Sequence, residues 1–528
     1  MQSSVWARRL AAGASLGAAL FLAHEARSFC RTVTHAPPAD WNATAQGCYV
    51  DALGGAKALF WKNSCVGYSL HASASRQVTF AQATEVVAAA FEAWTSVGCA
   101  QGGTPSVHGV DLGPVECGKV QYNRDQGNQN VIFFHDDVWP YSASDSTLGL
   151  TTVTFDTMSG EILGADIEIN ATQNLVLGEG GPAATYNLNS VITHEVGHFL
   201  GLAHSIEANA VMFAKYMPVP HLTADDVQGL CSIYPPDGSR MTTDGAVKGL
   251  SCDPTPHGGF ISACTSPGGG TGGSSQPDTG QASGGCSIGM GRGNRSVLAA
   301  WSSALALGFV AWRRRRARSK AVHALGGAHA VRIASIVSVV LTVLLGAVRE
   351  GRASVSIAIQ LEELARNSTA AAIVRPVEHR AVWENGRIFS YTRVQVEEVV
   401  AGNLAAEIWV RTMGGAVGTT GQLVEGEAVL ELGQRAMLFL KPQLDEMARP
   451  VTGNFEVTAR AQGHFLIAID ENKEPRLVSS RALGALVAPS LRPLARPIGP
   501  FAVEALHGRS VVDATRQIAE LWRSVRAR

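Results

Sequence analysis

The chain has little net charge, no long apolar run and no cysteine after position 286. Its 43 Lys and Arg residues nearly balance its 44 Asp and Glu residues, so the net charge is −1. This balance leaves no basic footprint for nucleic acid. Its apolar stretches reach only about fourteen to sixteen residues, short of the roughly twenty that a membrane helix needs. No cysteine follows Cys286, so the part of the chain after it cannot depend on disulfides as the part before it can.

The N-terminus has the pattern of a secretory signal peptide. Two arginines, Arg8 and Arg9, precede an apolar stretch at residues 10–23. The small residues Ala26 and Ser28 then frame a cleavage site. We therefore predict a signal peptide at residues 1–28, followed by a short N-terminal segment at 29–58. Export would bring the cysteines into an oxidising compartment.

Nine cysteines are available for pairing in that compartment. They stand at positions 30, 48, 65, 99, 117, 231, 252, 264 and 286. The sequence does not fix their connectivity, although Cys99–Cys117 and Cys252–Cys264 are plausible local loops. An odd count leaves one cysteine over, and Cys286 fits that role as a processing or lipidation site.

The most informative run reads His-Glu-Val-Gly-His-Phe-Leu-Gly-Leu-Ala-His, from His194 to His204. His194 and His198 are four residues apart, so a helix places both on one face, where they can share one Zn²⁺. Gly201 lets the chain leave the helix and fold back, so that His204 can supply a third nitrogen ligand. Glu195 stands beside the metal rather than on it, placed to take a proton from water. A fourth position left open for water is typical of a catalytic zinc site.

The residues after this run resemble the matrixins among the metzincin zinc peptidases. Met212 follows the last histidine as the methionine of the turn beneath the metal does in metzincins. Tyr216 follows, and a last helix begins Leu-Thr-Ala-Asp-Asp, with Thr223 as its N-cap and Asp226 completing a capping box. The resemblance covers residues 59–237. It implies an α+β fold, a metzincin catalytic domain with a twisted mixed sheet and a zinc helix, and protein or peptide substrates.

The upstream segments have the patterns that such a domain requires. Asn189 or Ser190 can cap the zinc helix. The resemblance also implies that residues 213–221 shape a substrate pocket. Residues 164–170 alternate with period two, as an edge strand should. In matrixins that strand borders the cleft and pairs with the bound peptide, so we expect substrate near Ala165–Ile169. We further expect strands at 60–70, 130–134 and 150–155, and an amphipathic helix at 81–97.

Two features of vertebrate matrixins are missing. The chain has no Pro-Arg-Cys-Gly run to place a thiolate on the zinc in a latent form. About thirty residues separate the cleavage site from the first strand, too few for a helical pro-domain. Asp166 and Glu168 stand where a histidine of the structural zinc site is expected. These carboxylates either hold Ca²⁺ or form a solvated strand face.

The middle of the chain predicts a linker and a tail. Residues 238–285 are rich in Gly, Ser and Pro and cannot bury a core. Cys286, the apolar stretch 297–312 and an arginine cluster then make up residues 286–318. This order resembles the sorting tails of myxobacterial surface proteins. The alternative is an ordinary membrane span with its arginines in the cytoplasm.

A second apolar stretch lies at 333–348, within the segment 319–353. The sorting tail is therefore not the end of the chain, and two arrangements are open. Either both stretches form a membrane hairpin with the flanking domains outside, or two exported proteins are fused. Residues 354–490 alternate as strands do and predict a β-rich domain, a small antiparallel barrel or sandwich of unknown role. Residues 491–528 form a C-terminal segment.

Together these features predict an exported zinc metalloendopeptidase, at the cell surface, in the outer membrane or extracellular. Glu195 would act as the general base, and His194, His198 and His204 would bind Zn²⁺. Gly201 and Met212 would support the site without taking part. The alternative is a cell-surface binding or scaffold protein with an inactive metzincin-like domain. The intact Glu195 favours the enzyme.

Overall fold

The structure is a computed structural model of the whole chain. It describes residues 29–35, 48, 55–117, 119–141, 147–177, 185–213, 221–261, 264, 355–445, 447–483, 485–487 and 500–527. These residues fall in one compact unit. The predicted signal peptide, Cys286 and the apolar stretches 297–312 and 333–348 lie outside them. No helix in the described part of the chain is long and apolar enough to cross a membrane.

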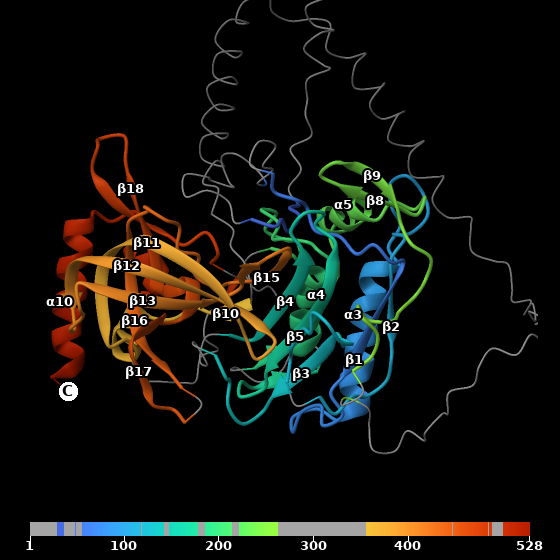
Figure 1. Cartoon of the computed structure of the whole chain (residues 1–528), viewed down its shortest axis with the longest axis horizontal. Helices are drawn as coiled ribbons and strands as arrows, with labels where there is room; N and C mark the ends of the chain where they lie inside the picture. Colours follow the sequence, from blue (N-terminus) through green and yellow to red (C-terminus); the bar gives the residue numbers. More distant parts are fainter. Residues whose placement is uncertain are drawn as a thin grey trace, which may run out of the picture. The chain divides into compact units, whose positions relative to one another are not determined.

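The first domain is built on a mixed sheet in which four strands run parallel. These are β1 (Cys65–Leu70), β2 (His108–Asp111), β3 (Val131–His135) and β5 (Ile162–Asn170), in the order β2-β1-β3-β5. Strand β4 (Gly149–Asp156) follows β5 and is antiparallel to it. The helices α3 (Phe80–Thr95) and α4 (Leu188–Phe199) pack against each other and against this sheet (Figure 1). The predicted α+β fold is confirmed.

Helix α3 begins and packs as its sequence indicates. Thr79 and Gln82 form a capping box at its N-terminus. Val87, Phe91 and Trp94 recur at helical spacing and are buried in the core of the domain. The Trp94 indole donates a hydrogen bond of 2.8 Å to the Thr193 carbonyl oxygen, which ties α3 directly to α4.

The predicted edge position of residues 164–170 is wrong. Strand β5 lies inside the sheet, paired with β3 on one side and with β4 on the other. Its alternating Asp166 and Glu168 suggested a solvent-facing side, but both residues are buried. The polar side of β5 meets other polar groups of the protein instead of water, and a period-two pattern cannot distinguish these two cases.

The disulfides join distant segments rather than the local loops that the spacing suggested. The described cysteines pair as Cys30–Cys48, Cys65–Cys252, Cys99–Cys231 and Cys117–Cys264. The suggested disulfides Cys99–Cys117 and Cys252–Cys264 are therefore wrong, because each of these cysteines pairs with a different partner.

The first domain also extends into the predicted linker. Residues 239–248 form a hairpin of β8 (Ser239–Thr242) and β9 (Gly245–Lys248). The buried Arg240 side chain donates to the Trp61 carbonyl oxygen at 2.8 Å. Two of the disulfides then tie residues 252 and 264 to the domain, so its fixed part reaches residue 264.

The C-terminal part of the chain forms a closed β-barrel, as one of the two predicted alternatives. The barrel strands are β11 (Ala370–Glu384), β12 (Arg387–Ala401), β13 (Glu407–Met413), β17 (Pro450–Val457) and β16 (Ala436–Leu444). The pairing of β16 with β11 closes the ring. The pairs are antiparallel except for β13 with β17, which run parallel. Strands β18 (His464–Ile469) and β19 (Pro475–Ser479) extend the sheet from β16.

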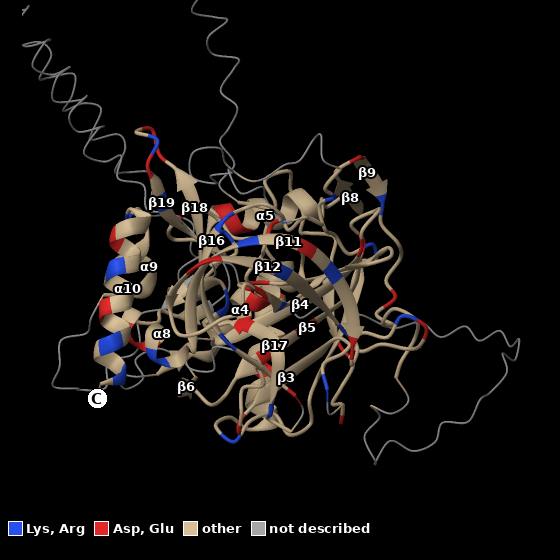
Figure 2. Cartoon of the chain, turned by 60° about the vertical axis from the view of Figure 1, so that its left-hand side comes forward, with Lys and Arg blue, Asp and Glu red and all other residues tan. Residues whose placement is uncertain are grey.

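Helices cover one side of this barrel and belong to the same domain. They are α8 (Leu361–Asn367), α9 (Ala502–Leu506) and α10 (Val511–Arg526). Ile518 and Trp522 of α10 are buried with Phe439 of the barrel, while the opposite face of α10 carries acidic and basic residues (Figure 2). The predicted limit at residue 490 is therefore too early, because this core needs residues of the C-terminal segment.

A hairpin of the C-terminal domain joins the sheet of the first domain. It consists of β14 (Gly415–Val417) and β15 (Thr420–Val424), together with the turn between them. Strand β15 pairs antiparallel with β4, so the sheet has seven strands in the order β14-β15-β4-β5-β3-β1-β2 (Figure 1). Nothing in the sequence of either strand indicates this pairing. The short strands β10 (Val355–Ile357) and β20 (Ala485–Val487) pair in parallel.

Candidate metal centre and active site

Helix α4 carries the first two histidines of the candidate site. Its N-cap is Asn187, whose side chain accepts a hydrogen bond from the Ser190 backbone N–H at 3.1 Å, so the predicted caps Asn189 and Ser190 are wrong. Every residue of α4 apart from Asn189 is buried. The packing around the helix therefore restricts how its side chains, including His194 and His198, can rotate.

The turn after α4 brings the third histidine, His204, back towards the first two. Gly201 has φ +93°, a conformation that favours glycine. A Cβ atom there would lie 3.1 Å from the Leu59 carbonyl oxygen. The N-terminal segment holds the turn, because the Thr32 N–H donates to the Gly201 carbonyl and the Ala203 N–H donates to the Cys30 carbonyl, both at 3.0 Å.

The three histidines converge through their Nε2 atoms. His194 Nε2 lies 3.1 Å from His198 Nε2 and 2.9 Å from His204 Nε2. The ligand atoms of the three side chains all lie within 4.8 Å of one another. A tetrahedral Zn²⁺ with Zn–N bonds of about 2.0–2.1 Å would separate its nitrogens by about 3.3 Å. The observed nitrogen positions therefore fit a shared ion of this kind.

Backbone carbonyls orient two of these rings. His194 Nδ1 donates to the Val211 carbonyl at 2.7 Å, and His198 Nδ1 donates to the Leu202 carbonyl at 2.9 Å. A proton on Nδ1 leaves the lone pair of Nε2 facing the shared point, which is the usual arrangement around zinc-binding histidines.

The electrostatic environment keeps the histidines neutral. Burial lowers the pKa of His194 to about 4. Burial, and then the neighbouring imidazoles, hold the pKa values of His198 and His204 well below their ordinary range. Neutral imidazole is the form that binds a metal ion. The donor set, its geometry and its protonation state all fit a zinc site.

Glu195 is buried next to His194, with one carboxylate oxygen hydrogen-bonded and the other, also buried, without a partner in the described part of the chain. Thr151 Oγ1 donates to Glu195 Oε2 at 2.5 Å. Within the described part of the chain, Oε1 has no hydrogen-bond partner. Gly149 leaves room for it, since a Cβ atom at that position would lie 2.6 Å from Oε1. A buried carboxylate oxygen without a partner is rare and marks a place for a water or a substrate group.

The same burial makes Glu195 a better base than an ordinary carboxylate. Burial raises its pKa to about 7; the Thr151 hydrogen bond and the Arg460 charge act against this, and the Glu425 charge adds to it. A carboxyl group with a pKa near neutral can both accept and return a proton. The sequence did not identify Thr151, because nothing in its own segment links it to the helix.

Met212 lies against α4, as the metzincin pattern implies. A Cβ atom on Gly197 would lie 2.2 Å from Met212 Sδ, so the helix and the methionine can approach only at a glycine. Asp226 holds the turn: its Oδ2 accepts from the Val211 N–H at 2.8 Å, and its Oδ1 accepts from the Met212 N–H at 2.9 Å.

Asp226 has a second role at the start of α5 (Ala224–Ile233). It forms the predicted capping box with Thr223. One buried carboxylate thus joins the last helix to the turn beneath the histidines. The sequence predicted the cap but not this contact. Most of the predicted pocket wall, residues 214–220 with Tyr216, lies outside the described residues.

Glu168, offered as a calcium ligand, is occupied by protein donors. Its Oε1 lies 2.9 Å from His135 Nε2 and accepts from the Tyr141 hydroxyl at 2.7 Å, and its Oε2 pairs with Arg387 at 2.5 Å. Burial raises its pKa, but the Arg387 charge and the two hydrogen bonds outweigh burial and lower it to about 2. The expectation of a solvated strand face is therefore wrong. The contacts with His135, Tyr141 and Arg387 account for the buried charge of Glu168 without a cation.

Comparisons with known proteins place this geometry in a family. The family model described as matrixin matches residues 60–235. Human matrix metalloproteinase-20 is 35% identical over 106 residues, which cover 19% of this chain and 20% of that protein. Human neutrophil collagenase is 28% identical over 140 residues, 26% of this chain and 29% of that protein. Metalloendoproteinase 1-MMP of Arabidopsis thaliana is 32% identical over 109 residues, 20% and 28% respectively.

The chain spans less than a third of the length of each of these relatives. The matched region nevertheless contains every residue of the candidate site described above, from Thr151 to Asp226. It also agrees closely with the limits 59–237 that the sequence resemblance gave. The chain carries a matrixin-type metzincin domain over residues 60–235.

Proposed function

We propose that the chain is a zinc-dependent endopeptidase. In this proposal His194, His198 and His204 hold the ion, and Glu195 acts as general base. The observation that supports it most is the convergence of three neutral Nε2 atoms beside a buried carboxylate, one oxygen of which has no partner among the described residues. The matrixin match supports protein or peptide substrates.

Zn²⁺ held by these residues would polarise the scissile carbonyl and lower the pKa of a water. Glu195 would take a proton from water at Oε1, the oxygen that has no hydrogen-bond partner among the described residues. Its pKa of about 7 lets it pass the proton on to the leaving amine. Thr151 fixes Oε2 and so limits rotation of the carboxylate. Met212 supports α4 from below and touches no reacting atom in this scheme.

We also propose that the protein is exported and processed at Cys286. The four disulfides support an oxidising compartment, where such bonds persist. They use eight of the nine cysteines in the sequence and leave Cys286 as the ninth. This count favours a sorting or lipidation site over an incidental cysteine, and a surface or extracellular location follows from it.

Removal and return of the metal tests the proposed activity. The full chain should hydrolyse fluorogenic casein at a measurable basal rate, lose this activity with a zinc chelator, and regain it when Zn²⁺ is added. Metal content should follow the same course. Hydrolysis that continues after the metal is removed would contradict a zinc-dependent mechanism.

A further inference from the structure

The outer edge of β4 is where an extended peptide would reach the candidate active site. Strand β4 packs against α4, and Thr151 on β4 donates to the Glu195 carboxylate. A free strand edge in such a position can bind a peptide as an added strand. Here that edge is taken by the chain itself, because Thr152, Thr154 and Asp156 pair with residues of β15.

The contacts between β15 and β4 involve side chains as well as the strand ladder. Gln422 Nε2 donates to Thr154 Oγ1 at 3.1 Å, while its Oε1 accepts from the Ile388 N–H at 2.6 Å. Gly421 lies so close to Phe155 that a Cβ atom would come within 2.4 Å of the ring. Strand β15 therefore fits the edge of β4 closely, and the hydrogen bond from Ile388 holds it to its own domain.

Apolar contacts continue the pairing towards the active site. Val424, the last residue of β15, is buried in a cluster with Trp139 and Leu150 of the first domain. Leu423 packs against the main core of that domain. Apolar side chains at the end of β15 thus occupy positions beside β4 that would otherwise face solvent or a ligand.

A buried arginine fixes the segment after β15. Arg460 holds it, by donating to the Glu425 carbonyl oxygen at 2.5 Å and by a buried ion pair with Glu427 at 3.0 Å.

Other contacts anchor the barrel away from β15. Arg387 and Glu168 form a buried ion pair between the domains. The Tyr122 N–H donates to the Gly386 carbonyl oxygen at 2.9 Å, and the Arg124 guanidinium lies 5.2 Å from the Trp383 ring centroid. The hairpin of β14 and β15 is therefore only one part of a broad contact between the barrel and the first domain.

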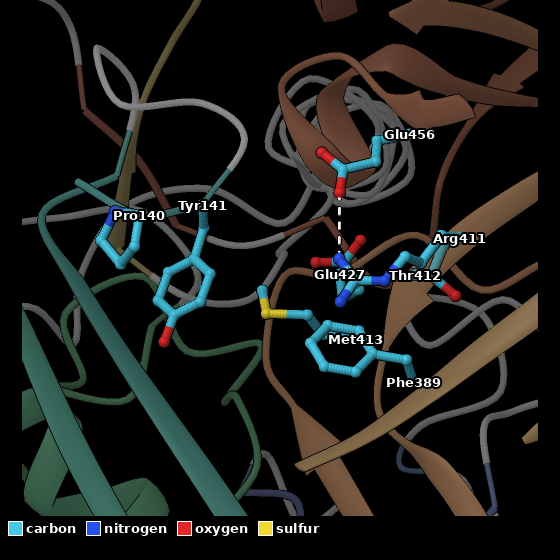
Figure 3. Close-up of a pocket in the computed structure, with 8 residues that line it drawn as sticks. All are labelled: Pro140, Tyr141, Phe389, Arg411, Thr412, Met413, Glu427 and Glu456. Carbon is cyan, nitrogen blue, oxygen red and sulfur yellow. Dashed lines mark hydrogen bonds and ion pairs between the residues drawn. The ribbon is translucent and has the colours of Figure 1, made fainter. Parts of the chain in front are cut away.

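The contact between the domains also contains a gap. A cavity of about 160 Å³ lies between Pro140 and Tyr141 of the first domain and residues of the barrel (Figure 3). Arg411, on its barrel side, pairs with Glu456 at 3.2 Å. Contacts that are partly polar and imperfectly packed are typical of domains that can separate.

We propose that the C-terminal β domain is a built-in inhibitor, which holds β15 in the place of a substrate peptide. This inference rests on the proposed peptidase function. It supplies the latency for which the sequence offers no thiolate switch. Release of the barrel would free the β4 edge and open the approach to Glu195.

The test compares the full chain with Gln422→Ala, which removes the bond to Thr154, and with Gly421→Val, which forces a side chain against Phe155. Hydrogen exchange of the β4 amides reports whether β15 is in place. Hydrolysis of fluorogenic casein reports access to the site. We expect protected β4 amides in the wild type, and in both variants lost protection with a rise in hydrolysis of about tenfold. Arg393→Ala breaks exposed ion pairs on β12 and should change neither measurement.

A second set of variants separates this inference from the proposed function. Each substitution is repeated in a Glu195→Gln background, and binding of labelled casein is followed by fluorescence anisotropy. If no variant hydrolyses casein, the proposed function fails, but tighter casein binding after Gln422→Ala still supports occupation of the edge. Fast exchange of the β4 amides in the wild type overturns the inference. So do unchanged casein binding and hydrolysis in variants whose β4 amides have lost protection.

Discussion

Arg387 of the β-barrel and Glu168 of the metzincin sheet form a buried ion pair with an N···O distance of 2.5 Å. Both side chains are almost fully buried, at 10% and 2% exposure, so neither charge has water as an alternative partner. Breaking such a pair by removing one member leaves an uncompensated charge inside the protein. This single contact links the stability of the two domains.

Arg387→Met should therefore destabilise the protein by about 3–5 kcal/mol near pH 7. The loss should depend on pH. The folded pKa of Glu168, about 2, lies below its ordinary value of 4.5, so the pair contributes fully above about 4.5 and is lost as the pH falls towards 2. Urea unfolding at pH 7 and pH 3 checks this, with Arg393→Met as a matched exposed control. An equal effect of both substitutions, or no change with pH, would contradict a buried pair.

His204→Ala should weaken zinc binding strongly. A site with three nitrogen ligands becomes one with two, and its metal affinity should fall by far more than the tenfold to hundredfold typical of losing an outer partner. Metal content after dialysis against a competing chelator provides the measurement. His108→Ala is the control, because His108 is exposed on β2 and far in sequence from the site. Equal metal content in the two variants would remove His204 from the site.

Cys286→Ser should block surface delivery if residues 286–318 are a sorting tail. The mature wild-type form would then end near Cys286, and the variant would accumulate uncleaved in the inner membrane. Immunoblots against the metzincin and barrel regions distinguish the forms. A single band that carries both epitopes, of equal size in wild type and variant, would rule out sorting and favour the membrane hairpin.

This last experiment also bears on the proposed inhibitor. Cleavage near Cys286 would separate the barrel from the metzincin domain in the covalent chain. The barrel could then remain bound only through the contacts around β15 and Arg387. Co-purification of two fragments would indicate that these contacts suffice.

The histidine site could be predicted from the sequence because it is local. A helix fixes the relation of His194 to His198, and one glycine with positive φ returns the chain to His204. The Met212 turn and the last helix follow within about thirty residues, and each has its own cap or turn signal. Short-range geometry thus determines most of the candidate centre.

The features that the sequence did not predict, such as the β15–β4 pairing and the disulfides, depend on contacts between residues far apart in the sequence. Gln422 meets Thr154 across 268 positions, and Cys65 pairs with Cys252 across 187. Neither pairing leaves a trace in the local pattern of either segment. The alternation in β5 was visible, but its polar side faces a buried arginine from another domain instead of water. Periodicity reports which residues share a face and not what covers that face.

The substitution Glu195→Gln tests the proposed mechanism most directly. Glutamine keeps the size of the side chain and can still bond to Thr151, but it cannot take a proton from water. Zinc content should stay as in the wild type, because Glu195 is not among the nitrogen ligands, while casein hydrolysis should fall by at least about a hundredfold. Near-normal hydrolysis by a zinc-loaded Glu195→Gln protein would contradict the role of Glu195 and with it the proposed mechanism.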